Sequence, residues 1–338
     1  MSNNTDIRIV RADALVHVTN RTARGELLLT PSDAVNAIVF GCLASAAQKY
    51  GVQVVVFVVM GNHFHLVLRV PRNNLSEFME WFTRESSMRL NSMRGTIGHR
   101  NFPDRYEPSE LVREEDFEQL VGHILTNPVR AGLVETSADW PGLSSLAAHQ
   151  SGDPVMVGHS VTRGHAKWID EDDFDDVEER CVVAVLELAP PPFWDGLDPE
   201  EAQRRLAGIV ERAEKELHEA ARQRKRTGRR RGTRRRRKRP VGPAAILAEK
   251  FTYRPDRAIL WREVGHITTS DPELAQAFED YRQDTVRRYR RAARLWRGFG
   301  QWGDYPPGTF PPGWVRPLRA SREGPPLPWW TPPLRAAA

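Results

Sequence analysis

Cysteine and long apolar runs are both scarce in this chain of 338 residues. Its two cysteines, Cys42 and Cys181, cannot build a disulfide framework or a four-cysteine zinc site, and a reducing cytoplasm is the simplest setting for them. No stretch approaches the roughly 18 uninterrupted apolar residues that span a membrane. The first residues also lack the apolar core of a secretory signal. These absences exclude the disulfide-rich and membrane-spanning classes and predict a cytoplasmic protein with no membrane partner.

Charge of both signs is present, but it is concentrated in blocks. The formal net charge of +5 hides eight acidic residues among positions 170–179 and thirteen Lys or Arg among positions 222–239. The basic block repels itself, so we expect it to be disordered when free and to bind phosphates when a nucleic acid is present. A solvated charged linker is the alternative. The arginines expected to contact phosphates are Arg229, Arg230, Arg231, Arg234, Arg235, Arg236 and Arg237.

The first 150 residues alternate between strand and helix patterns. Thr30 followed by Pro31 predicts a helix start with Thr30 as its cap, and Gly51 closes that helix. The expected elements are a strand over 15–21, a helix over 31–51, strands over 54–60 and 63–70, a helix over 75–93, a strand over 105–112 and a helix over 117–126. This order predicts an α+β fold of the ferredoxin-like βαββαβ kind.

Two histidines separated by one apolar residue lie in the second strand of the expected hairpin. Gly61 and Asn62 form its turn, and His63, Phe64 and His65 follow. Side chains alternate between the two faces of a strand, so both imidazoles point to one face and Phe64 to the other. Two neutral imidazoles side by side suit a divalent metal ion, although an isolated triplet of this kind is more often a pair of ordinary strand histidines.

Four short motifs occur together in the first half of the chain: HVTNR at 17–21, MGNHFHLVL at 60–68, DRYEPSELV at 104–112 and NPVRAGLV at 127–134. In this order and spacing they resemble the single-tyrosine (HUH) insertion-sequence transposases, and most closely the REP-associated tyrosine transposases. The resemblance covers residues 7 to about 148. It implies a ferredoxin-like HUH domain that acts on DNA.

The resemblance also implies a metal site and a DNA partner. In that family the His-hydrophobe-His pair holds Mg²⁺ or Mn²⁺, which assigns His63 and His65 here, although Gly61 stands where relatives usually have proline. A polar residue one turn after the nucleophile completes the site, a position that Asn127 fills. The family tyrosine attacks single-stranded DNA and forms a 5′-phosphotyrosine. The implied partner is single-stranded or hairpin DNA, and a homodimer stays open because relatives act as monomers or dimers.

The nucleophile is where this chain departs from the family. Relatives read Tyr-Ile-x-x-Asn-Pro-Val-Arg-Ala, whereas His123 occupies the tyrosine position here. A phosphotyrosine stores energy for strand transfer, whereas a phosphoramidate on histidine is more labile. One interpretation is a lost nucleophile in a chain that still binds DNA. A second is an altered site in which His123 acts as nucleophile, general base or third metal ligand. A third recruits another tyrosine, chiefly Tyr106, which otherwise packs against the sheet.

Several polar and basic residues of the domain are candidates for contact with DNA. His17 and Asn20 lie at positions that match the family, and a phosphate backbone crossing the sheet would contact several arginines. His99 and His149 give no signal above that of ordinary surface histidines. The DNA-contact candidates in the domain are His17, Asn20, Arg21, Arg105 and Arg130.

The composition changes after residue 150. Residues 151–197 are predicted to form an acidic and Pro-rich linker, loop-like over 151–168 and either strand or helix over 181–186. Residues 198–338 are predicted to form a basic, mostly helical extension with the arginine-rich segment 222–239 and a tail rich in Pro and Trp. Asp198 is a good cap for a helix from Pro199, and a further helix over 272–296 adds more arginines.

The sequence therefore predicts a ferredoxin-like HUH domain over residues 1–150, joined to an Arg-rich helical extension. The predicted function is metal-assisted cleavage and joining of single-stranded or hairpin DNA ends. The alternative is a catalytically inactive transposase relative that only binds nucleic acid. A third class, RNA binding through the arginine block, would show as a preference for RNA over hairpin DNA.

Overall fold

A central sheet fixes the positions of the other elements. The computed structural model describes residues 10–96, 98–161, 181–226, 241–248, 267–299, 305, 306 and 309. Predictions that concern the acidic run at 170–179, the arginines at 229–237 and the tail at 310–338 lie outside these ranges.

Four antiparallel strands form most of the sheet, in the order β2-β3-β1-β4. They are β1 (Ala14–Arg21), β2 (Gln53–Met60), β3 (His63–Val70) and β4 (Glu107–Leu111). With a helix after β1 and another after β3, this is the ferredoxin-like arrangement, so the predicted α+β class is confirmed. A short strand that no sequence pattern predicts, β7 (Ile267–Thr268), pairs in parallel with β4.

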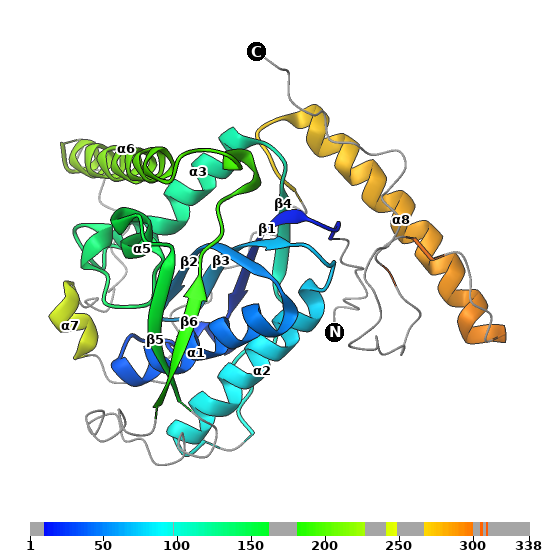
Figure 1. Ribbon diagram of the computed structural model, residues 1–338, viewed down its shortest axis with the longest axis horizontal. Helices are drawn as coiled ribbons and strands as arrows, with labels where there is room; N and C mark the ends of the chain where they lie inside the picture. Colours follow the sequence, from blue (N-terminus) through cyan, green and yellow to red (C-terminus); the bar gives the residue numbers. More distant parts are fainter. Residues whose placement is uncertain are drawn as a thin grey trace.

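Two helices cover one face of the sheet (Figure 1). α1 (Asp33–Tyr50) and α2 (Leu75–Met93) pack there on alternate strand residues such as Phe64 and Leu66. The Ser32 side chain caps α1 by accepting a hydrogen bond from the Val35 backbone N–H at 3.2 Å. The predicted cap, Thr30, instead donates to the Leu27 carbonyl, because the helix begins at Asp33 rather than at Pro31.

A second helical layer covers the opposite face. It contains α3 (Glu114–Leu125), α4 (Asn127–Arg130) and α5 (Leu146–Ser151), and α6 (Pro199–Arg226) packs against all three. α3 begins at Glu114 rather than at the predicted Phe117, so acidic residues form its first turn, where the helix dipole favours them. α6 begins at the predicted Pro199, and Asp198 Oδ1 accepts a hydrogen bond from the Glu200 N–H at 3.4 Å.

The segment predicted to be a linker contains two paired strands. β5 (Val155–Val161) pairs antiparallel with β6 (Cys181–Glu187), and both strands contact α1. A Cβ at Gly158 would lie 2.6 Å from Phe40 Cδ1, so the glycine lets β5 rest directly on the helix. The loop prediction for 151–168 is therefore wrong over 155–161, and the open choice at 181–186 resolves to strand.

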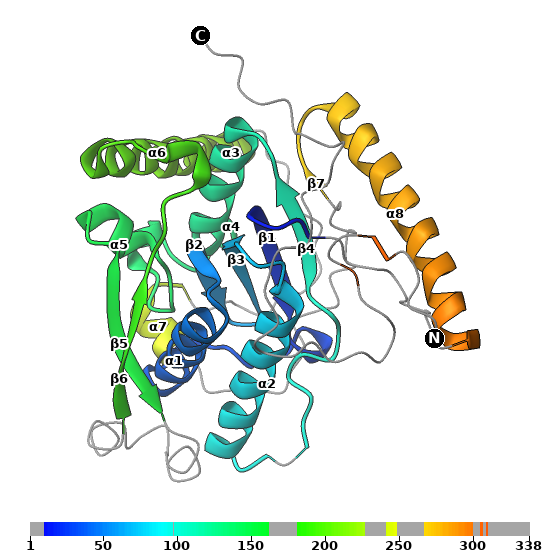
Figure 2. The same ribbon diagram turned by 45° about the vertical axis from the view of Figure 1, so that its right-hand side comes forward.

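The described part of the extension also contains α7 (Pro243–Leu247) and α8 (Pro272–Phe299). Both views show α8 running along the outside of the sheet at the β4 edge (Figures 1 and 2). Single 3-10 turns at Ala23–Gly25, Ser137–Asp139 and Pro192–Trp194 complete the described elements. Within the described ranges, no helix combines the length and the apolar character needed to cross a lipid bilayer.

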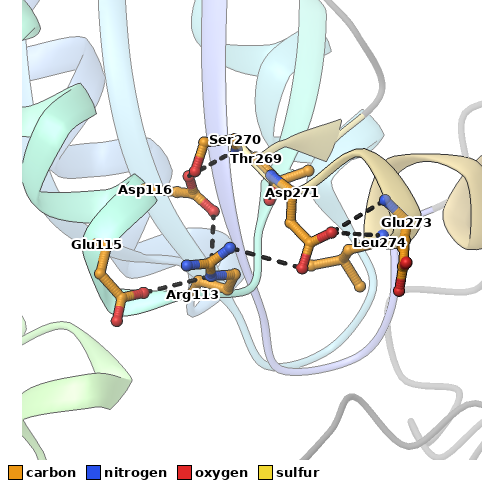
Figure 3. A network of polar contacts seen from close by, with 8 residues as sticks. All are labelled: Arg113, Glu115, Asp116, Thr269, Ser270, Asp271, Glu273 and Leu274. Atoms are coloured by element: carbon orange, nitrogen blue, oxygen red, sulfur yellow. Dashed lines mark hydrogen bonds and ion pairs between the residues drawn. The ribbon is translucent and has the colours of Figure 1, made fainter.

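A polar network joins the start of α8 to the start of α3 (Figure 3). Asp116 accepts hydrogen bonds from the Ser270 backbone N–H at 2.8 Å and from the Ser270 hydroxyl at 3.0 Å. Arg113 lies 3.8 Å from the Asp116 carboxylate and 3.7 Å from that of Asp271. Asp271 in turn caps α8 by accepting from the Glu273 N–H at 2.9 Å. The start of α8 is therefore held on α3 as well as, through β7, on β4.

α3 and α6 approach each other closely at Gly122. A Cβ at this position would lie 3.2 Å from Ile209 Cγ2 and 3.3 Å from Ala213 Cβ. Leu206 and Ile209 of α6 are buried. α6 therefore supports the part of α3 that carries His123.

Replacing Gly122 with Val should lower the free energy of unfolding by about 1–3 kcal/mol, because the branched side chain forces α6 away from α3. Gly208→Ala is the matched control, since a Cβ there would have only Arg212 Nη1 nearby, at 3.7 Å. That control should stabilise the chain by about 0.5–1 kcal/mol through better helix propensity. Denaturant unfolding followed by circular dichroism measures both. Equal effects of the two substitutions would contradict the close contact.

His149 on α5 is half-buried rather than an ordinary surface histidine. Its Nε2 donates a hydrogen bond to the Val55 carbonyl at 3.0 Å, and burial lowers its pKa from 6.5 to about 4. The folded chain therefore holds this ring neutral at pH 7. Because the folded pKa lies below the unfolded value, the unfolded state binds more protons in the window from pH 6.5 down to about pH 4.

Stability should consequently fall as the pH is lowered through that window. We expect His149→Gln, which keeps a hydrogen-bond donor but does not titrate, to lose roughly 2 kcal/mol less than the native chain between about pH 7 and about pH 4.5. Urea titrations at the two pH values measure the difference. Equal losses in both proteins would show that His149 has an ordinary pKa in the folded state.

Candidate functional site

The two histidines of β3 lie on the face of the sheet opposite α1 and α2. Phe64, between them, is fully buried, with its ring centroid 5.4 Å from that of Phe82 and 5.6 Å from that of Phe102. His63 and His65 are half-buried on the other face, with ring centroids 5.0 Å apart and planes nearly perpendicular. The predicted alternation along β3 is thus confirmed, and it places both imidazoles on the side covered by α3.

His17 on β1 contacts this pair directly. Its Nε2 lies 3.0 Å from His65 Nδ1, and the two rings stack with centroids 5.2 Å apart. β1 runs antiparallel to β3 with Thr19 opposite His65, so His17 lies diagonally across from His65. Because His17 is itself buried, its side chain reaches His65 rather than a surface that DNA could contact. The sequence motif marks His17 but does not reveal this contact.

Hydrogen bonds engage the Nδ1 atoms of both β3 histidines. His63 Nδ1 lies 2.7 Å from Asn62 Oδ1, which can only accept, so His63 carries a proton on Nδ1. Donation from His65 Nδ1 to His17 Nε2 gives His65 the same tautomer. Each ring then has an unprotonated Nε2 with a lone pair. Partners on the other ring nitrogen are the usual means by which proteins orient metal-binding histidines.

The side chain of Asn127, on α4 in the helical layer, extends to His65. Its amide nitrogen Nδ2 donates a hydrogen bond to His65 Nε2 at 3.1 Å. Neighbouring ligand atoms around a Mg²⁺ ion with bonds of about 2.1 Å are about 3 Å apart, so the amide oxygen, brought here by a half-turn of the side chain, fits a shared ion. Within the described residues, no three His, Cys, Asp or Glu side chains are grouped to hold a metal. The Asn127 amide oxygen is a further possible ligand, of another chemical kind.

Burial keeps these imidazoles neutral. Desolvation, and next the charge of His123, lower the pKa of His17 to about 4. Desolvation followed by the charges of Arg21 and His123 lowers the pKa of His63 to about 4. Desolvation also lowers the pKa of His65 well below its usual value, and the other two histidines add to the effect. A cation requires neutral imidazoles, because only these offer a lone pair.

His123 lies on the solvent side of α3, near the pair. Its side chain is exposed, yet its charge is close enough to lower the pKa of His17, His63 and His65. Partial desolvation, and next the charge of Arg130, lower the pKa of His123 itself. The neutral form is thus favoured at pH 7, with a nitrogen lone pair that solvent or substrate can reach.

Two of the arginines predicted to contact DNA flank the site. Arg21 lies opposite His63 in the register of β1 and β3 and lowers the pKa of that histidine. Arg130 on α4 donates from Nε to the Thr126 hydroxyl at 3.2 Å and lowers the pKa of His123. Both guanidinium groups place positive charge beside the imidazoles, where it attracts a phosphate.

Two other predicted site residues lie on the far side of the sheet. Asn20 is buried and pairs with Phe64 in the register, which places it in the layer of α1 and α2. Tyr106 is buried in that same layer, with its hydroxyl 3.1 Å from Ser76 Oγ. Neither can act together with the histidine pair, because side chains of one strand alternate between faces. Burial in that layer does not fit the prediction that Tyr106 supplies a substitute nucleophile, and the predicted contact of Asn20 with DNA stays a prediction.

The remaining predicted contacts stay predictions. Arg105 is exposed just before β4. The predicted phosphate contacts of the arginine block lie outside the described residues. The set that the structure brings together is His17, His63, His65, His123, Asn127, Arg21 and Arg130.

Known proteins provide an independent comparison. Residues 14–109 match the family model described as IS200-like transposase. A solved REP-associated tyrosine transposase bound to a REP hairpin is similar, with 18% identity, a TM-score of 0.38, and coverage of 45% of this chain and 86% of that chain. A candidate transposase from Deinococcus radiodurans shares 21% identity at a TM-score of 0.27, covering 35% of this chain and 93% of that chain. No curated protein sequence matches the chain.

The family assignment depends on the sequence match, because both structural similarities are weak. The matched range includes β1 and β3 and therefore His17, His63 and His65. It ends before α3, so His123 and Asn127 lie beyond it. Residues 14–109 of this chain are thus similar to the IS200-like transposase family.

Proposed function

We propose that the N-terminal domain binds single-stranded or hairpin DNA ends and cleaves a phosphodiester bond with the help of Mg²⁺ or Mn²⁺. This proposal rests on the proximity of His63, His65 and Asn127. Two neutral imidazoles from the sheet and an amide from the helical layer lie together there. The family of residues 14–109 supports DNA as the substrate.

Each residue of the site has a distinct role in this proposal. His63, His65 and Asn127 would hold the ion, which when bound polarises the scissile phosphate and offsets its growing negative charge. Arg21 and Arg130 attract the DNA phosphates on either side. His17 is a positioning residue, because its hydrogen bond holds the His65 ring with Nε2 directed away from β1.

His123 occupies the position of the family nucleophile. Its neutral imidazole can promote cleavage in two ways. It can attack phosphorus directly, forming a phosphorus–nitrogen bond as the bond to the 3′ oxygen breaks and that oxygen takes a proton. It can instead accept the proton of a water molecule that attacks phosphorus. The first route leaves a labile phosphohistidine and the second leaves no adduct. Neither stores energy as durably as a phosphotyrosine, so we expect cleavage to exceed joining.

The second candidate function is DNA binding without cleavage. It is favoured by His123 itself, which replaces the residue on which the family chemistry depends while the surrounding site is in place. Electrostatic attraction of DNA phosphates does not require that residue. A homodimer stays a prediction under either function.

Calorimetry with Mn²⁺ tests the metal site without any need for activity. We expect the native chain to bind the ion, and His63→Ala or His65→Ala to abolish binding, because each removes a ligand nitrogen. His17→Ala should weaken binding by roughly 10–100-fold, the usual cost of losing an orienting partner. His218→Ala is the control, since this half-buried histidine on α6 forms a hydrogen bond with the Glu135 carbonyl and lies outside the site. Undiminished binding by His65→Ala would rule out the proposed ligand set.

Restoring a tyrosine tests whether the rest of the site is competent. With Mn²⁺ and a labelled hairpin oligonucleotide, His123→Tyr should nick the DNA and form a protein–DNA adduct that survives a denaturing gel. The native chain should nick without an acid-stable adduct, and His123→Ala should nick about 10²–10⁴-fold more slowly.

His123→Phe is the matched control for the tyrosine variant, because it has the same ring without the hydroxyl. It should bind the hairpin and form no adduct. If the native and tyrosine proteins both bind the hairpin but neither cuts it, the cleavage proposal fails and the binding function remains.

A further inference from the structure

The second half of α8 carries charge of a single sign. The acidic residues of this helix all lie at or before Asp284, whereas the segment 285–299 contains six arginines and no acid. Like charges three or four residues apart in a helix repel by about 0.2–0.5 kcal/mol per pair. A polyanionic partner would remove this repulsion, so this half of the helix is suited to bind one.

Five of these arginines form one stripe on the side of α8 that faces away from the protein. Successive helical residues are rotated by about 100°, which gathers the five within an arc of about 120°. The opposite side is the packed one, since Phe278, Tyr281, Thr285, Ala292 and Ala293 are buried there. The arginine stripe consists of Arg287, Arg290, Arg291, Arg294 and Arg297, all of them exposed.

No carboxylate in the described part of the chain pairs with most of this stripe. Arg287 lies 3.4 Å from Asp284, so one member has a carboxylate partner. Arg290, Arg291, Arg294 and Arg297 form no ion pair within the described residues. Elsewhere on the surface, arginines such as Arg205 on α6 do pair, in its case with Glu114 at 2.9 Å. The stripe therefore differs from an ordinary solvated face, on which both signs are mixed.

The stripe is held in a fixed position relative to the histidine site. The network of Arg113, Asp116, Ser270 and Asp271 ties the start of α8 to the start of α3, the helix that carries His123 (Figure 3). The Tyr281 ring packs close enough to β4 for the charges of Arg11 and Glu110 to act on its pKa. A ligand bound along α8 would therefore have a defined position relative to the histidines.

We propose that the arginine stripe of α8 binds the phosphate backbone of duplex DNA, such as the stem of a hairpin whose end reaches the histidine site. This deepens the proposed function and rests on it for the choice of DNA. From Arg287 to Arg297 the helix rises about 15 Å, a length over which one strand of a duplex carries about four phosphates. The stripe has no aromatic side chain on which unpaired bases could stack, so it fits a duplex better than a single strand.

The salt dependence of binding by the full chain tests this inference. Each phosphate contact contributes about 0.9 to the slope of log K against log salt on duplex DNA. The triple variant Arg290→Gln, Arg291→Gln, Arg294→Gln should therefore bind a labelled duplex stem with a slope smaller by about 2.7 than that of the native chain. Gln has nearly the helix propensity of Arg, so α8 should stay folded, which circular dichroism checks.

A second triple variant controls for the loss of net charge. Arg204→Gln, Arg205→Gln, Arg212→Gln removes the same charge from α6, where these arginines face Glu201, Glu114 and Glu118 at 3.1, 2.9 and 3.6 Å. Its slope should match that of the native chain. The basic block 222–239 is present in every protein tested, so differences between slopes report the substituted helix. Equal decreases in the two variants, or none in either, would overturn the inference.

Further outcomes separate this inference from the proposed function. If the native chain cuts hairpin DNA but the α8 variant keeps the native slope, only the inference about α8 fails. If the slope changes as expected while no protein cuts DNA, the cleavage proposal fails and the stripe remains a duplex-binding surface. A larger change of slope on duplex RNA or on single-stranded DNA than on duplex DNA would assign the stripe to that partner and overturn the inference.

Discussion

The alternation of side chains along β3 is the constraint on which the rest of the site depends. Phe64 is fixed in the aromatic cluster with Phe82 and Phe102. His63 and His65 must therefore lie on the opposite face of the sheet. Slippage of the strand by one residue would bury both imidazoles under α1 and α2 and expose the phenyl ring, at a cost of several kcal/mol. The core therefore positions the polar site, although none of its aromatic residues takes part in chemistry.

The other half of the site is held by packing between helices. α3 lies against the sheet through buried residues such as Phe117 and Val121, and α6 closes over it at Gly122. This arrangement fixes the end of α3 from two sides, and Asn127 follows at once in α4. The hydrogen bond between Asn127 and His65 thus adds a polar contact between α4 and β3, beside the apolar core that α3 and α6 share with the sheet. A change in this core would alter the distance between these two side chains.

Local pattern was enough to predict the parts of the fold that depend on neighbouring residues. The order of strands and helices and the common face of His63 and His65 follow from periods of two and 3.6 residues, whereas the place of Asn127 in the site was implied by the resemblance to the transposases. The same period could have shown that Asn20 faces away from His17, since the two lie an odd number of positions apart. The hydrogen bond from His65 to His17 depends on the pairing of β1 with β3, which no local pattern determines.

The linker prediction failed for a related reason. Val155, Val157, Val183 and Val185 face solvent, while small residues such as Gly158 and Ala184 lie against α1, so the segments show no ordinary amphipathic alternation. β7 has only two residues, which pair with Glu110 and Leu111 at the β4 edge, and the Thr268 hydroxyl there lies 2.6 Å from that of Ser109. Both features depend on tertiary contacts between segments far apart in the chain, and such contacts override local preference.

Under the proposed function, attraction of DNA and chemistry on DNA would depend on different parts of this molecule. The positive charge of Arg21 and Arg130 acts over several ångströms. It does not depend on which reactive atom the side chain at position 123 carries. Covalent chemistry, by contrast, requires a nucleophile within bonding distance and an intermediate that lasts until the second strand arrives. Under the proposed function, a histidine at position 123 would not give the durable intermediate, but the charges, the imidazole pair and its orienting hydrogen bonds would still be in place. Such a site would lose strand transfer far more than binding, and the two activities that a tyrosine keeps together would be separate.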